Sequence, residues 1–313
     1  MYMDTRRKPL QKRFDFLRDW RLYVMMLLPL TFYFIFSYKP MVGVGIAFTR
    51  FNPVKGMWAS KWIGLENFKF IMKMPDFPIA LGNTLLLNFM GLLAGFPVPI
   101  ILAIMLNEIR SVGAKKISQT LLYLPHFLSW VIIGGMVLQI FAPTTGVVNA
   151  TLRKLGMIGA EENIPFLTAG WPWRITYTLV GVWQNMGWGT ILYLSAITGI
   201  NMELFEAAKI DGANKLQQIW HVTLPGIRST IVVLLILNVG QMMNIGFDLP
   251  YIIGNPMVKP YCDVLSTFVY RTGISNSQFA RATAVGLFQS VVGLIMVSTA
   301  NFITKRLGED GIW

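Results

Sequence analysis

Long apolar stretches separated by short polar segments dominate the pattern of this chain. Crossing a bilayer as an α-helix takes about 20 mostly apolar residues, because the hydrocarbon offers no water to satisfy the backbone. Six stretches meet this description, so the pattern predicts an all-α membrane protein with six transmembrane helices. These run approximately over residues 22–38, 79–106, 117–141, 173–200, 227–253 and 282–304.

Composition and charge agree with a membrane protein. The 313 residues are 54% hydrophobic and 13% charged, with a mean hydropathy of +0.53, which is too apolar for a soluble domain of this length. The formal net charge of +12 could indicate nucleic-acid binding, but the basic residues are dispersed among short loops between the apolar stretches. Membrane topology therefore explains the charge more simply.

The distribution of Lys and Arg indicates the orientation in the membrane. With the amino terminus in the cytoplasm, six spans return the carboxyl terminus there, so residues 1–21 and the tail 305–313 are both cytoplasmic. The inner segments then hold 15 Lys and Arg and the longer outer segments hold 10, which is the bias that the positive-inside rule requires. Most of the outer charge lies in residues 39–78, where WIGLENFKFIMKMPDF (62–77) is typical of a short amphipathic helix at the membrane surface.

A polar segment of helical composition, residues 201–225, separates the fourth and fifth predicted spans on the inner side. Gly212 can adopt the left-handed backbone conformation that ends a helix, and Pro225 cannot continue one. The segment is therefore predicted to form two short helices joined by a tight turn and closed at Pro225. Residues 206–211 then form a compact, exposed knob.

The spacing within this segment carries a resemblance to a known family. Glu206-Ala207-Ala208 is followed four residues after Ala208 by Gly212 and then, after nine intervening residues, by VTLP (222–225). This resembles the EAA loop of ABC importer permeases, a coupling helix that sits in a groove of a cytoplasmic ATPase. The resemblance implies that the ATPase-coupling residues are Glu206, Ala207, Ala208, Asp211, Gly212, Ala213, Leu224 and Pro225.

The resemblance extends over almost the whole chain. The segments LPHFLSW (124–130), DGANKLQQIWHVTLPGI (211–227), AVGLFQSVVGLI (284–295) and LGEDGIW (307–313) are similar to the maltose-type oligosaccharide permeases. Within that family they resemble a branch that includes permeases for acidic oligosaccharides such as alginate and rhamnogalacturonan fragments. One departure is NIGFDLP (244–250), where the branch usually has an acidic residue and Gln after Gly-Phe.

The resemblance implies a type I ABC importer permease fold in a bacterial inner membrane, together with a set of partners. A second homologous permease would complete a heterodimeric transmembrane domain, and two cytoplasmic ATPase subunits would bind ATP and Mg. An extracytoplasmic solute-binding protein would deliver an oligosaccharide. This chain would then supply half of an alternating-access pathway and one coupling loop, with no cofactor of its own.

The sequence carries no evident catalytic or metal-binding constellation. It has no GxxxxGK[ST] phosphate-binding loop, so it cannot be its own ATPase, and it lacks HExxH, CxxC and serine-elbow motifs. His126 and His221 are far apart and lack a set of companion ligands, and the single cysteine, Cys262, cannot form an intramolecular disulfide. We therefore expect neither an enzyme nor a metal site.

Neutral amide side chains gather within the predicted spans, and aromatic residues accompany them in the fourth. Polar groups inside a membrane should face the bundle interior or a watery path, although interhelical packing is the alternative for each residue. Aromatic faces beside amides suit the rings and hydroxyls of sugars. In the fifth span, four polar residues would share one helical face at about 100° per residue. The predicted substrate-pathway residues are Asn83, Asn88, Gln184, Asn185, Trp188 and Tyr193, and in the fifth span Asn238, Gln241, Asn244 and Asp248.

The sequence leaves two questions open. No Lys or Arg lies deep within a predicted span, which favours a neutral sugar, whereas the branch resemblance favours an acidic one. An ion-coupled secondary transporter is the alternative function, and it would need inverted repeats and buried acidic residues near the bilayer midplane. No convincing repeat is apparent, and acidic residues such as Glu108 and Asp248 lie at span ends.

Overall fold

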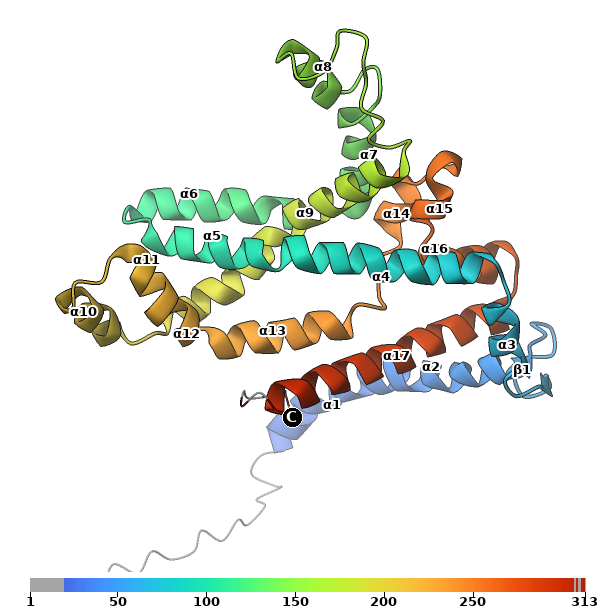
Figure 1. Ribbon diagram of the computed structural model, residues 1–313. Helices are drawn as coiled ribbons and strands as arrows, with labels where there is room; N and C mark the ends of the chain where they lie inside the picture. Colours follow the sequence, from blue (N-terminus) through green and yellow to red (C-terminus); the bar gives the residue numbers. More distant parts are fainter. Residues whose placement is uncertain (1–19, 307, 309–310, 313) are drawn as a thin grey trace, which may run out of the picture.

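The computed structural model describes residues 20–306, 308 and 311–312, and these are mostly helical (Figure 1). The predicted cytoplasmic segment 1–21 lies almost wholly outside the described residues. Most of the longer helices run roughly alongside one another, and α9 crosses between them diagonally (Figure 1). The longer helices are α1 (Trp20–Tyr33), α4 (Asp76–Gly95), α5 (Pro97–Glu108), α6 (Val112–Tyr123), α7 (Trp130–Ile140), α9 (Gly170–Thr198), α13 (Arg228–Gly240) and α17 (Phe279–Arg306).

Three continuous helical stretches, Trp20–Phe48, Asp76–Glu108 and Phe279–Arg306, are long and apolar enough to cross a membrane. Two further helix pairs meet the same test if each bent pair is one span, which raises the number among the described residues to five. The remaining predicted span, 173–200, corresponds to α9. Its 29 residues measure about 44 Å, more than the roughly 30 Å of hydrocarbon. The helical membrane fold is confirmed, and the number of six crossings stays a prediction.

The third predicted span, 117–141, is not one helix. A 3-10 turn, η3 (Leu124–Phe127), separates α6 from α7, and the two parts meet at 97°. Pro125 lies within that turn, and the side chain of Ser129 caps α7 by accepting a hydrogen bond from the N–H of Ile132 at 3.3 Å. A proline and a cap therefore bend a segment whose apolar pattern looks continuous.

The fifth predicted span, 227–253, is also divided. α13 ends at Gly240, and a turn over residues 241–247 leads into the short helix α14 (Asp248–Ile253). The prediction that four polar residues share one helical face is therefore wrong, because the helix stops before three of them. Those three are Gln241, Asn244 and Asp248.

Several short elements follow α14, on the side of the molecule away from residues 201–225. They alternate between helical turns and loops, and they cover the ends of α4 and α9. These elements are η5 (Pro256–Val258), α15 (Lys259–Cys262), α16 (Leu265–Tyr270) and the π-helical turn η6 (Arg271–Ser275).

Helix α9 lies at the centre of the bundle and buries more residues than any other described helix. Near its start, Trp173 is fully buried in an apolar cluster with α7 and α14. Near its end, Tyr193 packs in a second cluster with Ala103 of α5. At the crossing with α6, Gly187 allows contact between backbones, since a Cβ there would lie 2.1 Å from the carbonyl oxygen of Leu122.

Helix α1 differs from α9 because none of its residues is buried. It begins the stretch that continues through η1 (Phe34–Tyr38), α2 (Lys39–Met41) and η2 (Val42–Phe48), and this stretch lies beside α17 (Figure 1). Only the η2 end enters the core, where Ala47 is fully buried. The exposed apolar faces of α1 are typical of a helix that contacts lipid or another membrane subunit.

A short antiparallel hairpin that the sequence pattern does not predict follows the first helical stretch. Strand β1 (Thr49–Arg50) pairs with β2 (Lys61–Trp62). The amphipathic helix expected within residues 62–77 is present as α3 (Glu66–Met72) and is shorter than that segment. Helix α3 ends just before α4.

Candidate functional site

The segment between α9 and α13 forms two short helices joined by a tight turn, as the sequence predicts. Helix α10 (Met202–Ile210) begins after Asn201, whose side-chain oxygen accepts a hydrogen bond from a first-turn N–H at 3.0 Å. Helix α11 (Lys215–Gln218) begins after Asn214. The Asn214 side chain accepts from the N–H of Gln217 at 3.0 Å, and the Gln217 side chain accepts from the N–H of Asn214 at 2.7 Å.

Gly212 forms the turn between these helices. Its φ is +78°, in the left-handed region that favours glycine. Its N–H donates to the carbonyl of Lys209 at 3.1 Å, and the N–H of Ala213 donates to the carbonyl of Ala208 at 2.8 Å. This is the Schellman pattern, which satisfies carbonyl groups that the end of a helix otherwise leaves free.

Helical hydrogen bonding continues through Pro225, which the sequence predicts as the end of the second helix. A π-helical turn, η4 (Ile219–Thr223), leads directly into α12 (Leu224–Gly226), and the break falls at Ile227. Beyond it, α13 runs at 62° to the preceding helical run. Pro225 closely follows the π-helical turn, and the altered hydrogen-bond spacing of that turn accommodates a residue that has no N–H. Leu224 and Pro225 therefore lie inside a helical arm and not at its boundary.

The loop of residues 201–225 presents a mixed polar and apolar surface. Five large apolar side chains on it are exposed, and the three most exposed are Ile210 at 87%, Leu216 at 69% and Trp220 at 67%. Exposed apolar groups gathered on one loop are typical of a protein interaction surface. Among the predicted coupling residues, the exposed ones are Glu206, Ala207, Asp211, Gly212 and Pro225, and the half-buried ones are Ala208, Ala213 and Leu224.

An ion pair joins this loop to the bundle. The Nζ atom of Lys215 lies 2.6 Å from Oε2 of Glu108, the last residue of α5. Both side chains are substantially exposed, at 61% and 45%. The loop is therefore tied to α5 as well as to the two helices that flank it in sequence.

A cavity of 490 Å³ lies between α4, α5, α9, α13 and the turn after α13. It is lined by apolar side chains and by most of the amides that the sequence singles out. Its lining contains no Lys or Arg, and its single charged residue is Asp248. The predicted pathway residues that line it are Asn88, Asn185, Trp188, Tyr193, Asn238, Gln241, Asn244 and Asp248.

Three asparagines of the cavity wall donate hydrogen bonds from their side-chain nitrogen atoms to backbone carbonyls. Asn88 holds the turn after α13 by donating to the carbonyls of Met242 at 2.9 Å and Asn244 at 3.2 Å. Asn185 and Asn238 each donate to a carbonyl four residues earlier, at 3.0 and 2.7 Å. The side-chain oxygens of these three asparagines make no hydrogen bond within the described part of the chain, so they are free to accept from hydroxyl groups.

Two predicted pathway residues, Asn83 and Gln184, lie outside the cavity lining. Asn83 is buried; its amide nitrogen donates to two carbonyls around α15, both at 2.9 Å, and its oxygen accepts from Arg174 at 2.6 Å. Gln184 is also buried and donates to the carbonyl of His126 at 3.3 Å, at the bend between α6 and α7. Both residues form hydrogen bonds between separate elements of the bundle, which is the interhelical role that the sequence offers as the alternative to lining a pathway.

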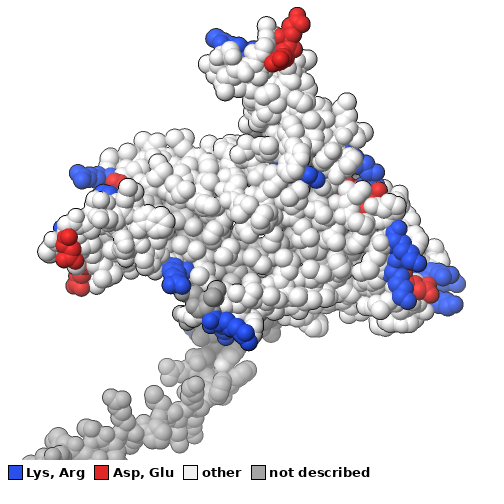
Figure 2. Space-filling view, viewed as in Figure 1, with Lys and Arg blue, Asp and Glu red and all other residues white. Residues whose placement is uncertain are grey.

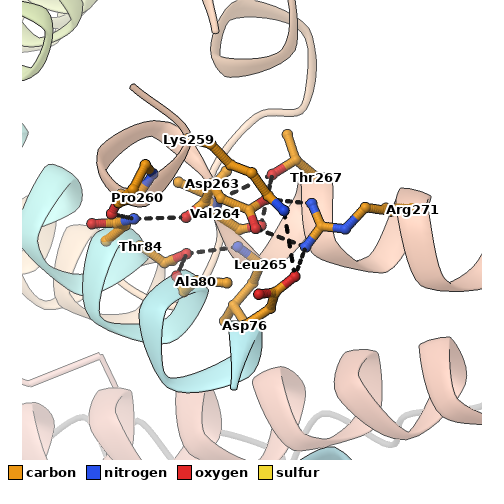
Figure 3. Close-up of polar contacts among 11 residues, drawn as sticks. Asp76, Ala80, Thr84, Lys259, Pro260, Asp263, Val264, Leu265, Thr267 and Arg271 are labelled. Atoms are coloured by element: carbon orange, nitrogen blue, oxygen red, sulfur yellow. Dashed lines mark hydrogen bonds and ion pairs between the residues drawn. The ribbon is translucent and has the colours of Figure 1, made fainter. Parts of the chain in front are cut away.

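A polar cluster that the sequence does not reveal ties the outer ends of the helices together (Figure 3). The guanidinium of Arg271 donates twice to Asp263, at 2.7 and 2.9 Å, and once to Asp76 at 3.1 Å. Thr267 donates to Asp263 at 2.8 Å, and Lys259 lies 3.7 Å from Asp76. These hydrogen bonds raise the pKa of Arg271, so its charge persists. Residues 195 positions apart thus meet at the start of α4.

The two histidines occupy separate places. The ring of His126 stacks on Trp188, with centroids 4.9 Å apart and an interplanar angle of 12°. His221 lies on the loop of residues 201–225, with Nδ1 3.0 Å from the carbonyl oxygen of Gln217. Within the described residues, no group of three or more His, Cys, Asp or Glu could hold a metal ion.

Similar proteins are known by sequence and by structure. Protein LplB of Bacillus subtilis (strain 168) is 43% identical over 297 residues, covering 95% of this chain and 92% of that protein. The polygalacturonan/rhamnogalacturonan transport system permease protein YteP of the same organism is 42% identical over 292 residues, covering 93% of this chain and 90% of its own.

Two solved structures match nearly the whole chain. A bacterial ABC transporter involved in the import of the acidic polysaccharide alginate aligns with a TM-score of 0.83 and 40% identity, over 93% of this chain and 97% of that one. A bacterial alginate ABC transporter in complex with an alginate pentasaccharide-bound periplasmic protein aligns with a TM-score of 0.84 and 38% identity, over 95% and 98%. Residues 95–309 match the family of binding-protein-dependent transport system inner membrane components. The chain therefore belongs to that family and is an ABC transporter permease, a transport component and not an enzyme.

Proposed function

We propose that this chain forms half of the pathway by which an ABC importer moves an oligosaccharide across the bacterial inner membrane. The observation that carries the proposal is that α9 lines an amide-rich cavity and leads directly into an exposed loop with an EAA spacing. Relatives whose names mention rhamnogalacturonan and alginate transport support an oligosaccharide as the substrate. A second, homologous permease supplies the other half, and an extracytoplasmic binding protein delivers the sugar.

The proposed coupling works through two mechanical connections. A cytoplasmic ATPase, which binds ATP and Mg, docks on residues 201–225. Motion of this loop reaches α13 across the 62° joint at Ile227 and reaches α5 through the pair of Lys215 with Glu108. Both helices line the cavity, so a shift of the loop changes the cavity's walls. The six-helix domain 22–304, with both termini in the cytoplasm, is part of this proposal.

The cavity wall suits an uncharged polyhydroxy ligand on this side of the pathway. The side-chain oxygens of Asn88, Asn185 and Asn238 accept hydrogen bonds, and the indole of Trp188 offers a flat apolar face. Any positive charge that an acidic sugar needs would come from the second permease, because the lining residues here include no cation.

Ala207→Trp tests the coupling loop without disturbing the interior, because Ala207 is exposed on α10. The matched control is Ala114→Trp, an exposed alanine in the first turn of α6. We expect the ATPase to copurify with the wild type and the control but to be lost from Ala207→Trp, with transport lost in parallel. Equal copurification and transport in all three proteins would contradict the proposed coupling role.

A further inference from the structure

The face of the molecule that lies away from the coupling loop can be located from one helical stretch. Asp76–Glu108 contains 33 residues, and its last residue binds Lys215 of the coupling loop. At about 1.5 Å per residue, Asp76 lies about 50 Å from that contact. The hairpin of β1 and β2 and helix α3 directly precede Asp76, so they lie at the outer end.

This outer end carries a concentration of positive charge. Five basic residues and a single acidic one occur between positions 49 and 75, and all six side chains are exposed. Figure 2 shows Lys and Arg gathered at this end of the molecule. Among the described residues, the lysines here form no ion pair, and Arg50 reaches Glu66 only at 4.0 Å. The basic outer surface consists of Arg50, Lys55, Lys61, Lys69 and Lys73.

Membrane topology does not account for this charge. The positive-inside rule disfavours clusters of Lys and Arg in short outer segments. The other large outer segment, residues 142–169, balances Arg153 and Lys154 with Glu161 and Glu162. The largest excess of exposed positive charge among the predicted outer segments therefore lies in residues 49–75 and calls for a separate explanation.

Hydrogen bonds and ring contacts hold the basic outer surface in a defined shape. The buried side chain of Asn67 donates to the carbonyls of Ala47 at 2.8 Å and Thr49 at 3.0 Å. The rings of Phe48 and Trp62 stack with centroids 5.4 Å apart. The lysines are thus displayed from an ordered platform that is fastened to the end of the first helical stretch.

We propose that the basic outer surface is the docking site for an acidic face of the extracytoplasmic binding protein. This inference rests on the proposed function, since the family to which the chain belongs depends on a binding protein. Opposite charges on two protein surfaces raise the rate at which the proteins associate and orient one relative to the other. The loop between β1 and β2 continues beyond the first helical stretch (Figure 1), and Val54 and Trp58 on it are 94% and 88% exposed. Exposed apolar side chains among the lysines offer a docking protein contacts in addition to charge.

The test measures association of the purified binding protein of the same transport system with the intact transporter in nanodiscs of phosphatidylcholine. The variant is Lys69→Glu with Lys73→Glu, both exposed, one on α3 and one just after it. The matched control is Arg110→Glu with Lys116→Glu, an equal charge change on exposed residues near the inner end. We expect the association rate constant to fall about 10-fold in the variant, with a weaker salt dependence, and to stay unchanged in the control.

Three outcomes bear on the inference, provided that both variants still copurify with the ATPase. An unchanged association rate and salt dependence in the Lys69 and Lys73 variant would overturn it. It would also be overturned if that variant associated normally but lost thermal stabilisation by added phosphatidylglycerol, because the surface would then bind lipid. If the binding protein fails to associate even with the wild-type transporter, the proposed function fails, and the inference fails with it.

Discussion

The elements at the outer end of the molecule are held together by different interactions from those at the inner end. At the outer end, Asn83, Asp263 and Arg271 belong to a connected network that joins α4, α9, α15 and α16 through buried or half-buried groups. At the inner end, the loop of residues 201–225 is tied to α5 through Lys215 and Glu108, both exposed. Breaking a buried ion pair costs about 3–5 kcal/mol, whereas an exposed pair contributes about 0–1 kcal/mol. The outer end is therefore built to keep its shape, and the inner end is free to move.

The largest effect is expected at the outer end, from Arg271→Ala. The variant leaves the carboxylate of Asp263, which is 5% exposed, without its charged partner. We expect the free energy of unfolding to fall by about 3 kcal/mol, measured as thermal unfolding of the purified complex in detergent. Lys259→Ala is the matched control, because that lysine is 53% exposed and lies 3.7 Å from Asp76. Equal losses of unfolding free energy in the two variants would show that the outer end is not held more firmly by its buried ion pair.

A smaller effect is expected midway between the two ends, from Gly187→Ala on α9. The new methyl group would lie 2.1 Å from the carbonyl oxygen of Leu122, so the α6–α9 crossing must open. Overpacking of this kind costs about 1–3 kcal/mol, and we expect a lower midpoint of thermal unfolding. Gly181→Ala, on the same helix with open space around it, should be neutral or slightly stabilising. Similar unfolding midpoints for both variants would show that the crossing is not tight.

The smallest effect on stability, and a larger one on transport, is expected at the inner end. Lys215→Ala should change the free energy of unfolding by less than about 1 kcal/mol, because the pair with Glu108 is exposed. If the pair carries motion from the loop to α5, substrate uptake per ATP hydrolysed should fall. The charge-swapped double variant, Lys215→Glu with Glu108→Lys, should restore part of it. Normal uptake in Lys215→Ala would show that motion of the loop reaches the helices through the joint at Ile227 alone.

The helical membrane fold and much of the cavity wall could be predicted because the bilayer limits what each side chain can do. Apolar stretches must become helices, and amides within them must face the interior, which brings Asn88, Asn185 and Asn238 to one cavity. The same reasoning cannot separate a wall residue from one that joins helices. Asn83 and Gln184 differ from the others because they are buried and because they bond to groups of other helices: backbone carbonyls for both, and Arg174 for Asn83.

The break in the fifth predicted span could not be predicted, because a tertiary contact holds the turn at which the helix stops. The fifth predicted span reads as one apolar run, yet Asn88 of α4 holds the turn after Gly240 from another part of the chain. At Pro225 the opposite error arises: a residue that usually ends a helix is accommodated next to a π-helical turn. The outer cluster around Arg271 gives no periodic signal, since Asp76 is so distant in sequence.

Helix α9 passes without interruption from the outer segment to the coupling loop, and it can therefore act as a lever. Its backbone contact at Gly187 is the natural fulcrum, which leaves arms of about 26 Å on the outer side and about 17 Å on the inner side. For a rigid rod of these proportions, a displacement of about 2 Å at the inner end moves the outer end by about 3 Å in the opposite direction, together with the elements that the outer network joins to it. Opening one side of the bundle while closing the other would then be a geometric property of a single helix and would need no separate gate.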